Sequence, residues 1–216
     1  MSSIETELSD LAFMQRAIKI ARTNLGKTAP NPSVGCVIMR GGDVLAEACT
    51  GAGGRPHAEQ LALASLEGQD LSEAVAYVTL EPCHSRSNGE AGCSDRLLHS
   101  GIKRVVVAEL DPHPTANGGV NKLRDAGIQV DVGIGAQDAK ILTAGFFKRM
   151  LTGWPLVSET DNRESYDGQF LVEKDESLHQ ALMRFGDAGH NRLWVSKHSE
   201  IAQALKAANL LDEIQE

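Results

Sequence analysis

The chain has 216 residues, of which 42% are hydrophobic and 23% are charged, and its formal net charge is −8. This length indicates one globular core, or one domain with an appendage. The acidic balance and the lack of a basic run of five or more residues argue against nucleic-acid binding, because phosphate contacts need clustered Lys and Arg.

The N-terminus shows no sign of a secretion signal. Its first ten residues, MSSIETELSD, are acidic and lack an apolar core. No window of the sequence approaches eighteen apolar residues, so no membrane span is expected. We therefore expect a cytoplasmic protein whose cysteines stay reduced.

Hydrophobic spacing predicts a helix over residues 11–25, with Asp10 as its N-cap. Two β-like runs follow at 34–39 and 44–48. Gly41-Gly42 between them is typical of a tight hairpin, because both turn residues tolerate positive φ. Helices are then expected at 57–68, 93–101, 120–126 and 136–151, and strands at 74–80, 102–110 and 128–134.

A hairpin followed by alternating helices and strands indicates an α/β domain. We predict a mixed five-stranded sheet between helical layers, a three-layer α/β/α sandwich. The run VVVA (105–108) has no polar alternation, so we place it in the sheet centre, covered on both faces.

The pattern changes after Trp154-Pro155. Residues 158–169 are polar and aperiodic, and the further elements expected are helices at 177–185 and 201–214 and a strand at 192–196. One strand and two helices do not make a second full core. We therefore divide the chain into a domain at 1–153 and a tail at 154–216, which docks on the main domain or on a partner subunit.

Candidate metal ligands stand at the ends of predicted elements. His57-Ala58-Glu59 begins a helix, Pro82-Cys83 follows a strand, and Cys93 begins the next helix. Zinc takes neutral imidazole and thiolate ligands, and catalytic zinc sites keep three protein ligands. A helix N-terminus favours the thiolate, because the positive end of the helix dipole lowers the thiol pKa. We predict one Zn²⁺ per chain, held by His57, Cys83 and Cys93.

Glu59 lies two residues after His57, so in the first helical turn its carboxylate points in a different direction from the imidazole. It is predicted to act as a proton shuttle and not as a ligand. An H-x-E pair followed by P-C and a second Cys is the signature of zinc-dependent deaminases.

The cysteines allow other interpretations. A disulfide between Cys83 and Cys93 is disfavoured in a reducing compartment. Cys36 and Cys49 lie in the predicted hairpin strands and are interpreted as small buried hydrophobic residues.

Six segments carry a resemblance to a known family and together cover nearly all of residues 10–157. They are APNPSVGCVI (29–38), RPHAEQLAL (55–63), VTLEPC (78–83), GIKRVVVAELDPHP (101–114), LRDAGIQV (123–130) and FFKRMLTGWPLV (146–157). On these segments the chain resembles the deaminase domain of the bifunctional riboflavin-biosynthesis deaminase/reductase, which has the cytidine deaminase-like fold. The nine residues between the two cysteines are close to that family's usual eight, whereas nucleoside and transfer-RNA deaminases generally have two.

The resemblance implies zinc-dependent hydrolytic deamination of a phosphoribosylated diaminopyrimidine, with Glu59 as the proton carrier. It also implies substrate contacts at Asn31, His84, Asp111 and His113, some of which depart from the family pattern. The family usually reads P-C-S-H where this chain has Cys83-His84-Ser85, and D-P-N-P where it has DPHP (111–114).

The substrate phosphate needs a local cation in this acidic chain. Arg86 is the nearest cation in sequence to the metal, so we expect it to contact the phosphate. The alternatives are that Arg86 is a solvated loop residue and that Arg55 or Lys103 binds the phosphate.

The tail resembles only fragments of that family's reductase domain, at SYDGQ (165–169) and EIAQALKAANLLDEI (200–214). We therefore predict no reductase activity. Two alternatives stay open: a deaminase of another purine, pterin or pyrimidine, or a catalytically silent zinc-binding subunit. The expected partners are a small phosphorylated aminopyrimidine and further copies of the chain in a homo-oligomer, without nucleic acid or membrane.

Overall fold

The computed structural model describes residues 3–86, 89–114 and 116–212. The chain forms two compact units, and each has its own sheet. Among the described residues, no helix combines the length and apolar character needed to cross a membrane. The first unit takes residues 1–23, 34–51 and 56–140, and the second takes residues 24–33, 52–55 and 141–216.

The first unit contains α1 (Ser3–Arg22), β1 (Gly35–Arg40), β2 (Asp43–Cys49), α2 (Ala58–Ala64), β3 (Val75–Val78), α3 (Cys93–His99), β4 (Arg104–Val107), α4 (Gly119–Asp125), β5 (Gln129–Val132) and the start of α5 (Ala136–Thr152). Its sheet has the order β2-β1-β3-β4-β5. β1 is antiparallel to β2 and β3, whereas β3, β4 and β5 are parallel. The predicted mixed five-stranded sheet is confirmed.

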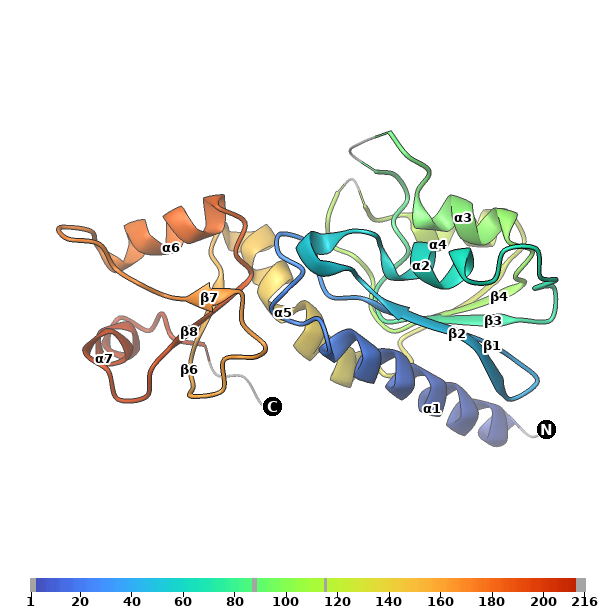
Figure 1. Cartoon of the computed structure of the whole chain (residues 1–216), viewed down its shortest axis with the longest axis horizontal. Helices are drawn as coiled ribbons and strands as arrows, with labels where there is room; N and C mark the ends of the chain where they lie inside the picture. The colour runs from blue at the N-terminus through green and yellow to red at the C-terminus, as the bar shows by residue number, and fades with distance from the viewer. Residues whose placement is uncertain (1–2, 87–88, 115, 213–216) are drawn as a thin grey trace. The chain divides into compact units, whose positions relative to one another are not determined.

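Helices cover both faces of this sheet (Figure 1). α1 packs on one face, and α2, α3 and α4 lie on the other. Alternate residues of each strand supply the two cores, as a sheet covered on both sides requires. Val105, Val106 and Val107 of β4 are fully buried, as predicted, although β3 and not β4 is the central strand.

Glycines make possible both the hairpin turn between β1 and β2 and the close packing of α1 on β1. Gly41 and Gly42 adopt φ of 59° and 98°, which confirms the predicted hairpin turn. At Gly35, an added Cβ would lie 1.9 Å from Ala17 O, so only glycine lets α1 approach β1 this closely.

The prediction that Asp10 caps the first helix is wrong, because α1 begins at Ser3 and Asp10 lies inside it. The carboxylate is buried and accepts hydrogen bonds from Tyr77 Oη at 2.7 Å and from Arg104 Nη1 and Nη2 at 2.9 and 2.6 Å. Asp10 therefore ties α1 to the sheet through β3 and β4.

The second unit has more structure than the sequence predicted. It contains η1 (Ala52–Gly54), most of α5, β6 (Leu156–Glu159), β7 (Gly168–Gln169), α6 (Leu178–Asp187), β8 (Arg192–Val195) and α7 (Glu200–Ala207). Its strands form a parallel sheet of order β6-β8-β7. A core of Val157, Phe170, Leu182, Leu193 and Leu205 lies within it.

The expectation of one strand and no second core is therefore wrong. β6 and β7 are too short to show a period of their own, and the sheet exists only because β8 pairs with both. The predicted last helix also ends early, at Ala207, because Asn209 adopts φ of 55° and ends the helical run. Residues 213–214 of that prediction lie outside the described residues.

We expect Asp10→Asn to lower the free energy of unfolding at pH 7 by about 2–3 kcal/mol, because it breaks a buried ion pair. Burial raises the pKa of Asp10, but hydrogen bonds from Arg104 and Tyr77 lower it further, to below its usual value. A carboxyl whose pKa is lower in the folded than in the unfolded protein stabilises the fold at pH values above its pKa in the unfolded protein, which is about 3.9. This stabilisation is lost as the pH falls through the pKa of the folded protein. The difference from wild type should therefore shrink below about pH 4.

Urea denaturation at pH 7 and at pH 3.5 measures both effects. Asp43→Asn, at an exposed position of the hairpin, is the control and should change the stability by less than about 0.5 kcal/mol. An equal loss for Asp10→Asn at both pH values would contradict this account of the carboxylate.

Candidate active site

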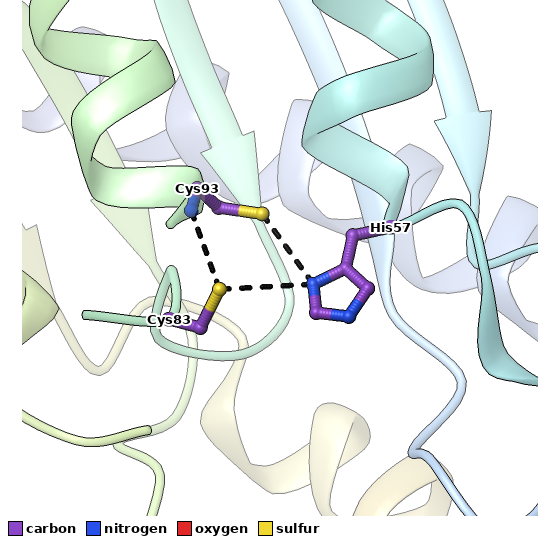
Figure 2. A group of neighbouring side chains, drawn as sticks. All are labelled: His57, Cys83 and Cys93. Atoms are coloured by element: carbon purple, nitrogen blue, oxygen red, sulfur yellow. Dashed lines mark hydrogen bonds between the residues drawn. The ribbon is translucent and has the colours of Figure 1, made fainter. Parts of the chain in front are cut away.

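The three predicted ligands come together in the first unit, and Figure 2 shows their side chains turned toward one another. His57 is the N-cap residue of α2 and has an extended backbone conformation. Cys83 lies in the loop after β3, and Cys93 is the first residue of α3. His57 Nδ1 lies 3.7 Å from Cys83 Sγ and 3.4 Å from Cys93 Sγ. The ends of three elements thus bring one nitrogen and two sulfurs to a single point.

These distances fit a tetrahedral zinc ion. Zn–S and Zn–N bonds of about 2.3 and 2.0–2.1 Å place a nitrogen and a sulfur ligand about 3.5 Å apart. The candidate ligand atoms of His57, Cys83 and Cys93 all lie within 4.8 Å of one another. The residues present therefore fit zinc, with the three protein ligands of a catalytic site.

The electrostatics of the thiols favour metal binding. Hydrogen bonding with Cys93 lowers the pKa of the Cys83 thiol well below its usual range, aided by His57 and by the Cys93 backbone N–H at 3.2 Å. The same pairing raises the pKa of Cys93, because a thiolate at Cys83 disfavours a second negative charge beside it. A divalent cation between the two sulfurs removes that conflict, since it deprotonates a coordinating thiol.

All four cysteines are free thiols. Cys36 is fully buried, as predicted, and burial raises the pKa of its thiol. Cys49 is only half-buried and lies 3.5 Å from Thr23 Oγ1, so its interpretation as a buried hydrophobic residue is only partly right.

Glu59 is buried in the first turn of α2, close to the ligand group. Burial raises the pKa of its carboxyl, whereas His57 and a hydrogen bond with Cys93 act in the opposite direction. A carboxyl in this position can carry a proton next to the metal site without being one of the three ligands.

Two glycines hold the backbone around Cys83. A Cβ added to Gly119 would lie 1.7 Å from Pro82 O, and one added to Gly92 would lie 2.7 Å from Cys83 O. Ser94 reinforces the packing, because its backbone N and its Oγ both donate to Cys83 O, at 3.2 and 3.0 Å. The N-termini of α3 and α4 thus enclose the loop that carries the ligand.

Glu81, which sequence reasoning missed, fixes the same loop from the other side. Its buried carboxylate accepts backbone hydrogen bonds from Asp111 at 3.1 Å, from Gly118 at 3.0 Å and from Val120 at 2.9 Å. Both ends of the segment after β4 are therefore tied to the residue two before Cys83. One feature of the sequence could have pointed to Glu81. It is an acidic residue between an apolar strand and Pro82-Cys83, where an exposed side chain is not expected.

The structure distributes the five predicted substrate contacts unevenly. His84 is exposed, and Asp111 is buried with Oδ1 accepting from His113 N at 2.8 Å. The side chain of Arg86 is only 2% exposed and does not extend into solvent. Asn31 lies in the second unit, where its Nδ2 donates to Gly54 O at 2.9 Å.

A hollow of about 700 Å³ lies beside the ligand loop, with His84 on its wall. Gly118, whose backbone N–H binds Glu81, is also part of this wall. The lining is mixed: it includes the polar side chains of Asn117, Asn121 and Lys122 and apolar ones such as Leu98.

Comparisons with known proteins agree with this site. Residues 8–109 match the cytidine and deoxycytidylate deaminase zinc-binding region. The riboflavin biosynthesis protein RibD of Escherichia coli K12 is 40% identical over 171 residues, which cover 79% of this chain and 46% of that protein. The diaminohydroxyphosphoribosylamino-pyrimidine deaminase of Buchnera aphidicola subsp. Schizaphis graminum is 40% identical over 149 residues, which cover 68% of this chain and 100% of that protein.

A solved structure supports the fold. Acinetobacter baumannii RibD (form 1) matches with a TM-score of 0.81 at 24% identity, over 95% of this chain and 85% of that one. Fold and site together define a protein of the class that carries the cytidine and deoxycytidylate deaminase zinc-binding region. Within that class the chain belongs to the family of diaminohydroxyphosphoribosylaminopyrimidine deaminases. It spans about half the length of the E. coli relative and the whole length of the Buchnera relative.

We expect the purified protein to contain about one zinc per chain, because one nitrogen and two sulfurs converge at the spacing of a tetrahedral site. Cys93→Ser should lose most of this zinc, since a hydroxyl is a poor substitute for thiolate. Metal analysis by mass spectrometry measures the content. Cys49→Ser is the matched control and should keep its zinc; full retention in Cys93→Ser would contradict the ligand assignment.

We expect Glu81→Gln to lower the free energy of unfolding by about 1–3 kcal/mol. An amide accepts through one atom only, so at least one of the three backbone N–H donors faces an NH₂ group. Thermal and urea unfolding measure the change. Glu73→Gln, at an exposed position, is the control; equal stability of the two variants would mean that Glu81 does not hold the loop.

Proposed function

We propose that the chain catalyses the hydrolytic deamination of a phosphoribosylated diaminopyrimidine in riboflavin biosynthesis. The observation that carries the proposal is a buried carboxyl, Glu59, beside a group of one imidazole and two thiols that fits zinc. A structural zinc site has no need of an adjacent proton carrier, which argues against a catalytically silent subunit. The 40% identity to the Buchnera deaminase, over that protein's whole length, supports the choice of substrate.

In this proposal His57, Cys83 and Cys93 hold the metal. The chemistry that zinc supplies in such a site is a hydroxide nucleophile at neutral pH, because zinc lowers the pKa of water toward about 7. Glu59 would accept the proton that the water loses and pass it to the ring nitrogen next to the reacting carbon. It would then take the proton of the hydroxyl group added to that carbon and deliver it to the departing amine. The carbon–nitrogen bond to the amino group breaks, a carbonyl replaces it, and ammonia leaves.

We assign the substrate contacts to Asn31, His84, Arg86, Asp111 and His113. The exposed imidazole of His84 supports its assignment, because it faces the hollow beside the ligand loop. The same hollow is also lined by Asn121 and by Lys122, a cation that could meet the phosphate of the substrate. Lys122 already pairs with Asp95 at 2.6 Å, so an anion there would compete with a carboxylate.

Three broader expectations stay predictions. The chain is expected to lack reductase activity, to act in the cytoplasm and to form a homo-oligomer. The division into a deaminase domain at 1–153 and a reductase-like remnant at 154–216 is also a proposal. The unit boundary within α5, between Lys140 and Ile141, offers a second division to test by limited proteolysis.

Ammonia release from a panel of aminoheterocycles tests the proposed reaction. The panel contains the phosphoribosylated diaminopyrimidine, its dephosphorylated form, cytidine and a pterin with an amino group. The highest kcat/KM is expected for the first compound. A preference for cytidine or the pterin would replace the proposed substrate, and no release from any compound would favour the silent subunit.

We expect Glu59→Gln to reduce kcat by about 10²–10⁴-fold while zinc content and folding persist, because the amide keeps the shape but cannot carry the proton. Steady-state kinetics and metal analysis on the same preparation measure both quantities. Glu67→Gln, at an exposed position after α2, is the matched control and should keep wild-type turnover. A near-normal rate in Glu59→Gln would assign the proton transfer to another group.

A further inference from the structure

Arg86 contacts one of the metal-binding atoms. It lies in the segment between Cys83 and Cys93, yet its side chain is only 2% exposed. Its Nη2 donates to Cys93 Sγ at 3.5 Å, which is within range for a hydrogen bond to sulfur. The guanidinium therefore approaches the same sulfur that faces His57.

Two further contacts fix the guanidinium in this position. Arg86 Nη1 donates to Gln60 Oε1 at 2.9 Å and to Glu90 Oε2 at 2.8 Å. Gln60 lies on α2, next to Glu59, whereas Glu90 belongs to the segment between the cysteines. Because the guanidinium is planar and rigid, bonds at Nη1 restrict where Nη2 can point. Arg86 thus links the helix that begins at His57 to Cys93.

The burial of this cation requires an anion close by. A buried charge costs free energy unless it is paired and hydrogen-bonded. The side chain of Glu90 is 51% exposed, so water screens much of its charge. Cys93 is fully buried, and its sulfur is the atom that the buried edge of Arg86 faces; a bound zinc ion would make that sulfur anionic.

We infer that Arg86 is a positioning residue of the metal centre, which donates a hydrogen bond to the Cys93 sulfur. This bond orients the sulfur and would take up part of its negative charge when metal is bound, as partners of metal ligands do in other sites. The inference rests on the metal-binding group and not on the identity of the substrate.

Zinc affinity, measured by competition with a chelator, gives the first test. Arg86→Ala should weaken zinc binding about 10–100-fold, the usual loss when the partner of a metal ligand is removed. Arg86→Lys should fall between the alanine variant and wild type, because an ammonium keeps the charge but not the fork. Glu90→Gln is the matched control: it removes the exposed charge but keeps an oxygen that accepts from Arg86, and should change the affinity less than about 3-fold.

Cobalt substitution gives a second readout, which a general loosening of the loop would not reproduce. In Arg86→Ala the sulfur-to-cobalt absorption band should move to lower energy, because the sulfur electrons lose the stabilising N–H donor. The band should stay in place in Glu90→Gln. If the alanine variant does not fold, Arg86→Gln has a side chain of similar length and carries the same expected losses.

Unchanged zinc affinity and an unchanged cobalt band in the folded variant would overturn the inference. So would a rise in KM for the phosphorylated substrate alone with metal binding intact, which would make Arg86 only a phosphate contact. Failure of the wild-type protein to deaminate any compound would remove the proposed function and leave both metal readouts valid. The two proposals can therefore fail separately.

Discussion

The metal centre depends on how tightly the backbone of Pro82 and Cys83 is enclosed. The backbone of Gly119 lies against Pro82 and that of Gly92 against Cys83, so closely that neither glycine position has room for a side chain. Glu81 binds three backbone N–H groups of the segment after β4 from within the same loop. A ligand on a loose loop would lose conformational entropy each time metal bound. Here that entropy is lost on folding, so the sulfur is already in place.

The sequence predicted the features that depend on local pattern. The hairpin at Gly41-Gly42 and the parallel strands after it follow from turn chemistry and hydrophobic spacing, and both are confirmed. His57, Cys83 and Cys93 are predictable as ligands because each stands at the end of a predicted element and is a residue type that zinc prefers. In a parallel sheet, the carboxyl ends of the strands and the N-termini of the helices that follow them lie at the same edge. Correctly predicted strands and helices are therefore enough to bring the three ligands together.

What the sequence did not predict depends on contacts between distant residues. Asp10 resembles a helix cap, and only the position of Arg104, 94 residues later, shows that it is a buried ion-pair partner. The strands β6 and β7 have four and two residues and need β8 between them. In the sequence Glu81 does not differ from other acidic residues. Its role depends on three backbone N–H donors, from Asp111, Gly118 and Val120, that only the fold brings to it.

The proposed site separates residues that regular structure holds in place from residues that lie in a loop. The metal ligands and Glu59 belong to element ends that glycine packing and the Glu81 carboxylate hold in place. His84 lies outside regular structure, on the wall of an open hollow, and no hydrogen bond between described residues joins its side chain to a ligand. Arg86 is the exception in this segment, because its guanidinium donates to the ligand sulfur of Cys93. If the inferred role of Arg86 holds, a substitution between the two cysteines affects the metal centre only where it removes the cation beside Cys93.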